Sequence, residues 1–308
     1  MARDAPPLTA AVSIEIPGST GTFDFLRVDT KRNRLLAAHE KAGTADYFDL
    51  QANKLLTRLK VGPAVDMAVD SDSNFYYVSV QDAERVGVID AATLQEVASI
   101  TTAGPTDAII FEPKNQRVYV THDDGTHIWV IDPATRKIVA TVTLPGKPES
   151  MVYDASTDRI YLNIKDKDVV AVIDPSSNKV VGQWPTTPAV HPHGMALDEA
   201  RHRVFSAGVN GKLITIDTRT GVTTGVVAIA RGVDQIAFDT SAQMVYCAGA
   251  GQMSVVRTSG DTPILVGNVT TSATARNVAV DPNTHAVWST FTDGKSSFAK
   301  SWMAPGAR

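Results

Sequence analysis

Residues 106–148, TDAIIFEPKNQRVYVTHDDGTHIWVIDPATRKIVATVTLPGKP, contain four short apolar runs: AIIF, RVYVT, IWVID and IVATVTL. Val, Ile and Tyr favour strands, and the Pro, Asn, Asp and Gly clusters between the runs favour turns. The stretch therefore predicts one antiparallel meander of four strands. Such a small sheet cannot bury both of its faces by itself, so it needs neighbours of the same kind.

The rest of the chain repeats this unit. An acidic residue ends the first run of each copy, and the separations between these acids are 41, 42, 42, 44, 41 and 42 residues. The repeated acids are Asp29, Asp70, Glu112, Asp154, Asp198, Asp239 and Asp281. Seven copies stacked face to face around an axis predict an all-β fold, a seven-bladed β-propeller with four antiparallel strands per blade.

The two ends of the chain predict how the ring closes. AAVSIEIPG, residues 10–18, aligns with IVATVTLPG, residues 138–146, which is the fourth strand of copy three. Copy seven stops after its third strand, at Met303. We therefore expect the N-terminal strand to complete the last blade. The whole chain, 1–308, is then a single propeller domain with an N-terminal arm (1–9) and a loose tail (304–308).

Composition excludes several classes of partner. The net charge is −4, with acids and bases interspersed and no basic run, so neither nucleic acid nor membrane insertion is expected. Cys247 is the only cysteine, which excludes a disulfide within the chain. Residues 1–7 contain no apolar run of signal-peptide length. A monomer is expected.

The second runs YYVSV, VYVTH and IYLNI are each followed about nine residues later by V-I-D. This pattern resembles the YVTN-repeat family of seven-bladed propellers, across essentially the whole chain. The resemblance implies the fold and, since bacterial members are often exported, a periplasmic or secreted protein whose signal has been removed. It carries no family-wide catalytic motif, so function has to be argued from the site.

One ring of positions is unusually charged. The loops from strand four to the next strand one, and from strand two to strand three, share one end of a propeller, here called the top. Five residues before each repeated acid, where the chain enters the innermost strand at this end, stand Asp24, Val65, Asp107, Glu149, His193, Asp234 and Arg276. Charges gathered around a narrow mouth predict a bound cation or polar ligand. The alternative is that these acids accept hydrogen bonds from neighbouring amides.

The ends of the second strands add imidazoles to the top. His39 is followed by Glu40, and His122 by Asp123 and Asp124. Imidazole and carboxylate together suit metal binding or general-base chemistry. We expect His122 to converge with Asp107 and Glu149, although it could simply begin a solvated loop.

The longest copy spacing lies in the top loop TTPAVHPHG, where His191 and His193 flank Pro192. On an extended segment two such residues point to the same side and can supply two ligands to one ion. The third ligand would come from Glu149, Asp234 or Asp107. The alternative is a stiff loop with two exposed imidazoles.

These residues support two functions. The first is a binding module whose acidic top mouth captures a divalent metal ion or a small polar or cationic ligand. The centre of this site is His193. The residues that bind the ligand in this interpretation are Asp24, His39, Asp107, Glu149, His193, Asp234 and Arg276.

The second function is a metal-assisted hydrolase or lyase of the lactonase kind, with His193, His122 and Glu149 as candidate catalytic residues. Both use one metal-ligand set: His122, His191, His193, Glu149, Asp107 and Asp234. The sequence does not decide whether the protein is an enzyme.

A third interpretation, a protein-interaction scaffold, would need apolar top loops, and these loops are polar. The acids that end the third runs, Asp90, Asp132, Asp174 and Asp217, recur too regularly for a site and predict turns.

Overall fold

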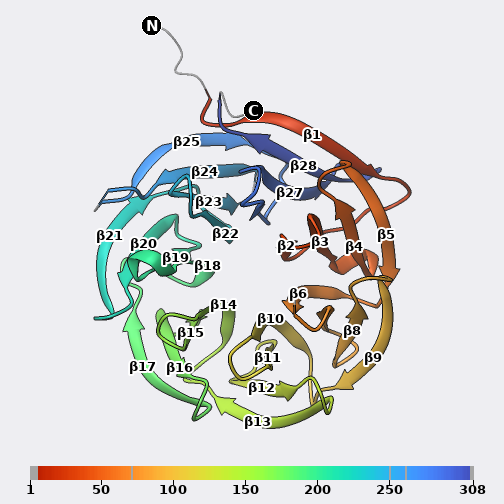
Figure 1. Cartoon of the computed structure of the whole chain (residues 1–308). Coiled ribbons are helices and arrows are strands. Elements are labelled where there is room, and N and C mark those ends of the chain that lie inside the picture. Colours follow the sequence, from red (N-terminus) through yellow and green to blue (C-terminus); the bar gives the residue numbers. More distant parts are fainter. Residues whose placement is uncertain (1–5, 71, 250, 261, 306–308) are drawn as a thin grey trace, which may run out of the picture.

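Seven four-stranded antiparallel sheets form a ring around a central axis in the computed structural model, which describes residues 6–70, 72–249, 251–260 and 262–305 (Figure 1). The predicted seven-bladed propeller is confirmed. Within these ranges the only helical turns are of the 3-10 type: η1 (Glu40–Ala42) and η2 (Glu199–Arg201).

Six blades take their strands in chain order from the axis outward. The first two blades contain β2 (Leu26–Asp29), β3 (Arg34–His39), β4 (Thr44–Asp49), β5 (Lys54–Lys60), β6 (Ala64–Asp70), β7 (Phe75–Val80), β8 (Arg85–Asp90) and β9 (Gln95–Thr101). The third and fourth contain β10 (Thr106–Glu112), β11 (Arg117–His122), β12 (His127–Asp132), β13 (Lys137–Thr143), β14 (Pro148–Asp154), β15 (Arg159–Ile164), β16 (Val169–Asp174) and β17 (Lys179–Pro185). The fifth and sixth contain β18 (Pro192–Asp198), β19 (Arg203–Gly208), β20 (Lys212–Asp217), β21 (Val222–Ala228), β22 (Val233–Asp239), β23 (Met244–Gly249), β24 (Gln252–Arg257) and β25 (Ile264–Thr270).

The seventh blade joins the two ends of the chain. Its sheet order is β26 (Ala279–Val280), β27 (Val287–Thr292), β28 (Ser297–Met303) and β1 (Thr9–Ile16), and Figure 1 shows β1 on the outside of β28. The antiparallel register pairs Thr9 with Met303 and Ile16 with Ser297. The predicted closure is confirmed, with the strand beginning one residue earlier than expected. Residues 1–5 of the arm and 306–308 of the tail lie outside the described part of the chain.

Apolar packing between neighbouring blades holds the ring together. The described residues form seven buried clusters, and each lies mainly at one blade–blade interface. In one of them Tyr119 and Ile128 of the third blade meet Met151 and Ile160 of the fourth. The arm takes part as well, because Leu8 packs with Met253 and Val269 of the sixth blade. Face-to-face burial of this kind is what an isolated blade lacks.

A second closure lies near the axis. The innermost strand of the seventh blade, β26, is only two residues long. The Gln235 Oε1 atom of the sixth blade accepts the Val278 amide of the seventh, at 3.4 Å, and the Leu26 amide of the first, also at 3.4 Å. Gln235 thereby links the sixth blade to the first across the shortened strand.

The acids at the ends of the third strands stabilise turns, as predicted. Asp132 accepts the Ala134 amide at 3.0 Å, and Asp174 accepts the Ser176 amide at 3.1 Å. Burial alone raises the pKa of Asp174, but hydrogen bonds from Ser176 and Ser177 outweigh this effect, so its pKa is below the ordinary value.

Removal of β1 tests the closure. Deleting residues 1–18 leaves the outer edge of β28 without a partner strand and exposes its apolar contacts, so the melting temperature should fall sharply. A narrower test is Ile16→Ala on β1, because Ile16 is fully buried in the cluster between the last and first blades. Chemical denaturation should show that Ile16→Ala lowers the unfolding free energy by about 2 to 5 kcal/mol. The matched control is Ile264→Ala on the outer strand β25, where Ile264 is half exposed and the loss should stay below about 1 kcal/mol. Equal losses would contradict the closure.

Asp174→Ala tests the turn acids. The variant should lose about 0.5 to 2 kcal/mol of unfolding free energy at pH 7, because the Ser176 amide loses its acceptor. A group whose folded pKa is lowered stabilises the fold above its unfolded pKa, and this contribution disappears as pH falls through the folded value. The difference between parent and variant should therefore shrink below about pH 4. Asp174→Asn, which keeps an acceptor oxygen, should lose less. Denaturation at pH 7 and pH 3 measures all three proteins.

Candidate functional site

The seven charged-ring positions line one recess at the top of the axis, of about 200 Å³. Four residues that begin the loops after the second strands share it, and so does Phe25: the loop residues are Glu40, Gln81, Asp123 and Lys165. We call this recess the top mouth. Its residues come from all seven blades, because the innermost strand of every blade begins at this end.

Most acids of the top mouth already have partners. Glu149 accepts a hydrogen bond from Lys165 Nζ at 2.6 Å, and Asp123 accepts one from Gln81 Nε2 at 2.6 Å. Asp234 lies 3.5 Å from Arg276 Nε. Burial alone lowers the pKa of Lys165, but Glu149 and other carboxylates nearby raise it by more, so this ammonium stays charged.

Asp24 and Asp107 differ from these acids. Within the described part of the chain, neither carboxylate has a hydrogen-bond or ion-pair partner. Asp107 is only 9% exposed, and both side chains line the recess. In ring order they flank Val65. Two carboxylates therefore face the recess with no compensating donor, an arrangement that costs free energy unless a ligand satisfies them.

The surroundings of these two acids raise their pKa values well above the ordinary range. For Asp24 the causes are burial first, then the charges of Asp234, Asp107, Glu149 and Asp66. For Asp107 they are burial, then Glu149, Asp123 and Asp66, while Lys165 acts in the opposite direction. Burial and the neighbouring negative charges thus favour the protonated form of both carboxylates.

The placement of His39 at the mouth was wrong. His39 is fully buried, its Nδ1 lies 2.9 Å from Asp46 Oδ2, and its ring stacks on Phe23 with a centroid distance of 3.6 Å. β3 ends at His39, and the next residue, Glu40, which begins η1, lines the mouth instead.

The same one-residue shift applies to His122. The His122 ring packs with the rings of His127, at a centroid distance of 4.8 Å, and Trp129, at 5.3 Å. Asp123 lines the mouth in its place, so the expected convergence of His122 with Asp107 and Glu149 does not occur.

His191 and His193 differ in their surroundings. His193 lines the mouth with Nε2 3.7 Å from Glu149 Oε1, and its Nδ1 donates to the His191 carbonyl at 3.1 Å. His191 has a left-handed backbone (φ 52°), so the segment is not the extended strand that the H-x-H argument assumed. The two rings are 4.9 Å apart, but His191 is exposed and does not line the mouth.

The predicted metal ligands do not fit a metal site. No three His, Cys, Asp or Glu side chains of the described residues are grouped so that they could hold one ion. His122 and His191 lie outside the mouth, and Glu149 is engaged by Lys165. No metal-dependent step can be built on this set.

The innermost strands also form two rings that the sequence reasoning missed. Three residues before each repeated acid lies the waist ring: Leu26, Met67, Ile109, Met151, Met195, Ile236 and Val278. One residue before each acid lies the lower ring: Val28, Val69, Phe111, Tyr153, Leu197, Phe238 and Val280. Both rings line the axis below the mouth. The sequence could have indicated both rings, because the side chains of alternate residues in a strand face the same side.

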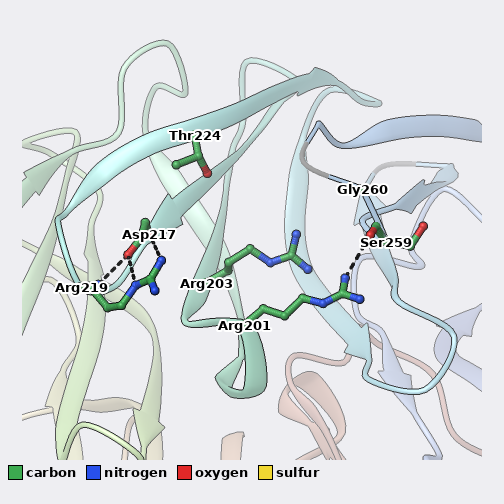
Figure 2. Close-up of a pocket in the computed structure, with 7 residues that line it drawn as sticks. All are labelled: Arg201, Arg203, Asp217, Arg219, Thr224, Ser259 and Gly260. Carbon is green, nitrogen blue, oxygen red and sulfur yellow. Dashed lines mark hydrogen bonds and ion pairs between the residues drawn. The ribbon is translucent and has the colours of Figure 1, made fainter.

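Another recess, of about 410 Å³, lies at the bottom end between the fifth and sixth blades (Figure 2). Arg201 and Arg203 extend toward the loop of Ser259 and Gly260, and Arg219 pairs with Asp217. Arg203 donates to the Thr258 carbonyl at 2.9 Å, and Arg201 to the Gln243 side chain. In the first blade the equivalent contacts are Arg34 to the Ala91 carbonyl and Arg32 to Asn74. Arg201 and Arg203 therefore serve a repeated link between blades.

Two further features concern reactivity and membranes. Cys247 is buried, and burial raises the pKa of its thiol, which disfavours the reactive thiolate. In the described ranges no helix has the length and apolar character needed to cross a membrane.

Solved structures share the fold at low sequence identity. A chain of Kuenenia stuttgartiensis hydrazine synthase is 14% identical with a TM-score of 0.79, covering 95% of this chain and 98% of that one. A chain of the mitotic checkpoint complex is 11% identical with a TM-score of 0.83, covering 99% and 94%. The RRP9 WD40 repeats are 10% identical with a TM-score of 0.80, covering 96% and 100%. These likenesses show the fold alone.

No curated protein sequence matches the chain. A family model described as a domain of unknown function, DUF5074, matches residues 57–294. That match spans most of the propeller, from the outer strand of the first blade into the seventh. The chain belongs to the DUF5074 family and folds as a seven-bladed β-propeller.

Proposed function

We propose that the protein is a binding module whose top mouth captures a small organic cation. The observation that carries the proposal is the pair Asp24 and Asp107, two carboxylates that line the recess and have no partner in the described part of the chain. A cation between them would offset both desolvation and mutual repulsion. The other acids of the mouth are engaged by Lys165, Arg276, Gln81 or Lys41.

The chemistry of the lining favours a primary ammonium group. Carboxylates accept hydrogen bonds, and an ammonium has three N–H donors to offer them. Among the described residues, Phe25 is the one Phe, Tyr or Trp that lines the mouth, so this lining does not form the aromatic cage that recognises quaternary ammonium ions. A recess of about 200 Å³ suits a short amine or the end of a longer one.

The same observations weigh against the metal-based interpretations. A divalent ion needs several ligands around one point, and no such group is present among the described residues. A metal-assisted hydrolase or lyase would need that ion as well as a base. His193 then belongs to the rim of the mouth, and the centre of the proposed site moves to Asp24 and Asp107.

Calorimetric titration with putrescine tests the proposal. At pH 7.5 the parent protein should bind putrescine, while tetramethylammonium and Zn²⁺ should bind more weakly. Asp24→Asn and Asp107→Asn should each weaken putrescine binding by about 10-fold or more, because a charge-assisted hydrogen bond becomes a neutral one. Asp132→Asn is the matched control: it removes the same charge from a bottom turn and should leave affinity unchanged. Equal affinity in the mouth variants and the control would overturn the proposal.

The raised pKa values predict an unusual pH dependence of stability. An acid whose folded pKa lies above its unfolded value of about 3.9 binds more protons in the folded state. The unfolding free energy should therefore fall as pH rises from about 4 through the raised pKa of Asp24 and Asp107. The double variant Asp24→Asn/Asp107→Asn removes this loss and should be more stable than the parent at pH 7.5.

Chemical denaturation of parent and double variant from pH 4.5 to 8.5 measures this difference. The comparison is needed because acids with lowered pKa values elsewhere, such as Asp124 and Asp166, change stability with pH in the opposite direction in both proteins. A double variant that is less stable than the parent at pH 7.5 would show that the two carboxylates serve the fold.

A further inference from the structure

The lower half of the central axis is a recess lined mainly by apolar side chains, here called the apolar recess. The waist ring and the lower ring enclose it, and every member of either ring is apolar except for the phenol group of Tyr153. All members of the lower ring are partly exposed, although residues such as Phe111, Leu197 and Phe238 would gain free energy from burial. The ring of blades is thus too wide at this level for these side chains to cover one another.

Two adjoining cavities, of about 410 and 330 Å³, make up this recess. They share Arg27, Val28, Val152 and Leu197, so they are two parts of one space. A much smaller cavity of about 20 Å³, lined by Phe25, Arg27 and Gln235 among others, lies between this recess and the top mouth. The recess and the top mouth have no lining residue in common.

Arg27 is the only charged residue that lines the recess among the described residues. Its Nε and Nη2 atoms donate to Asp66 at 2.9 and 2.6 Å, and its guanidinium lies 5.0 Å from the centre of the Phe25 ring. Nη1 donates to no group in the described part of the chain, and the side chain is 32% exposed. At the equivalent position the other blades have Ala68, Ile110, Val152, Ala196, Ala237 and Ala279. The guanidinium thus lies beside a recess whose other lining side chains are apolar except for Thr30 and Tyr153.

We infer that this recess is a second binding site, for a small hydrophobic molecule that carries one carboxylate. The apolar body would lie against the lower ring, and the carboxylate would accept hydrogen bonds from Arg27 Nη1. Most of the affinity would come from apolar burial, because Asp66 already balances the charge of Arg27. The two cavities have the volume of a small-molecule pocket, and side chains from all seven blades enclose them, which favours a free small molecule over a protein segment.

The test uses the fluorescent aromatic sulfonate 1-anilinonaphthalene-8-sulfonate, with octanoate as the competitor. The parent should enhance the fluorescence of the probe, and octanoate should displace it. Leu197→Trp places a large side chain where the two cavities meet and should weaken both ligands at least tenfold. Leu56→Trp is the matched control, because Leu56 is exposed on the outer strand β5 and the substitution leaves the recess open. Equal binding by the two Trp variants would overturn the proposal.

A second pair of ligands tests the role of Arg27. Octanoate should bind the parent more tightly than octanol, and the preference should disappear in Arg27→Gln/Asp66→Asn, in which both partners of the pair become neutral. Melting curves check that this variant folds. If it does not fold, the relative affinity of the parent for octanoate and octanol tests the carboxylate assignment by itself. Equal affinity of the parent for octanoate and octanol would refute the carboxylate assignment. Putrescine titration of Leu197→Trp distinguishes the two proposals. This variant should bind putrescine at the top mouth as tightly as the parent does, whether or not the lower recess binds octanoate.

Discussion

Burial of apolar side chains between neighbouring blades is the interaction on which the rest of the structure depends. Each small sheet has two faces to cover, and each described cluster of buried residues lies mainly at one interface between blades. A ring satisfies every face only if its first and last blades also meet. The pairing of β1 with β28 and the link that Gln235 makes to Leu26 provide this meeting at the outer and inner edges.

Once the ring is closed, the innermost strands are aligned around one axis. The residues five, three and one before each repeated acid then lie at three levels along that axis: the charged top mouth, the waist ring and the lower ring. The polar layer lies where loops bring in Gln81 and Lys165, and the apolar layers lie below it. One fold therefore offers two chemically distinct recesses, and substitutions in one need not affect the other.

The acids of the proposed site differ from the buried acids that serve the fold. Asp24 and Asp107 are held in a recess that raises their pKa values, and within the described chain no partner offsets their charge. Asp66 is more deeply buried, but Arg27 and two backbone amides satisfy it. Buried acids that serve the fold have donors, and acids that lack donors point to a ligand.

The sequence by itself determined the number of blades, the strand order, the closure and the seven positions of the mouth, because all of these follow from a period of about 42 residues and a strand period of two. Only the tertiary structure decided which acids have partners. Lys165 reaches Glu149 from a loop 16 residues away, and Gln81 reaches Asp123 from another blade. It also placed His39 and His122 away from the mouth, because each ends its strand and the residue that follows, Glu40 or Asp123, lines the mouth instead.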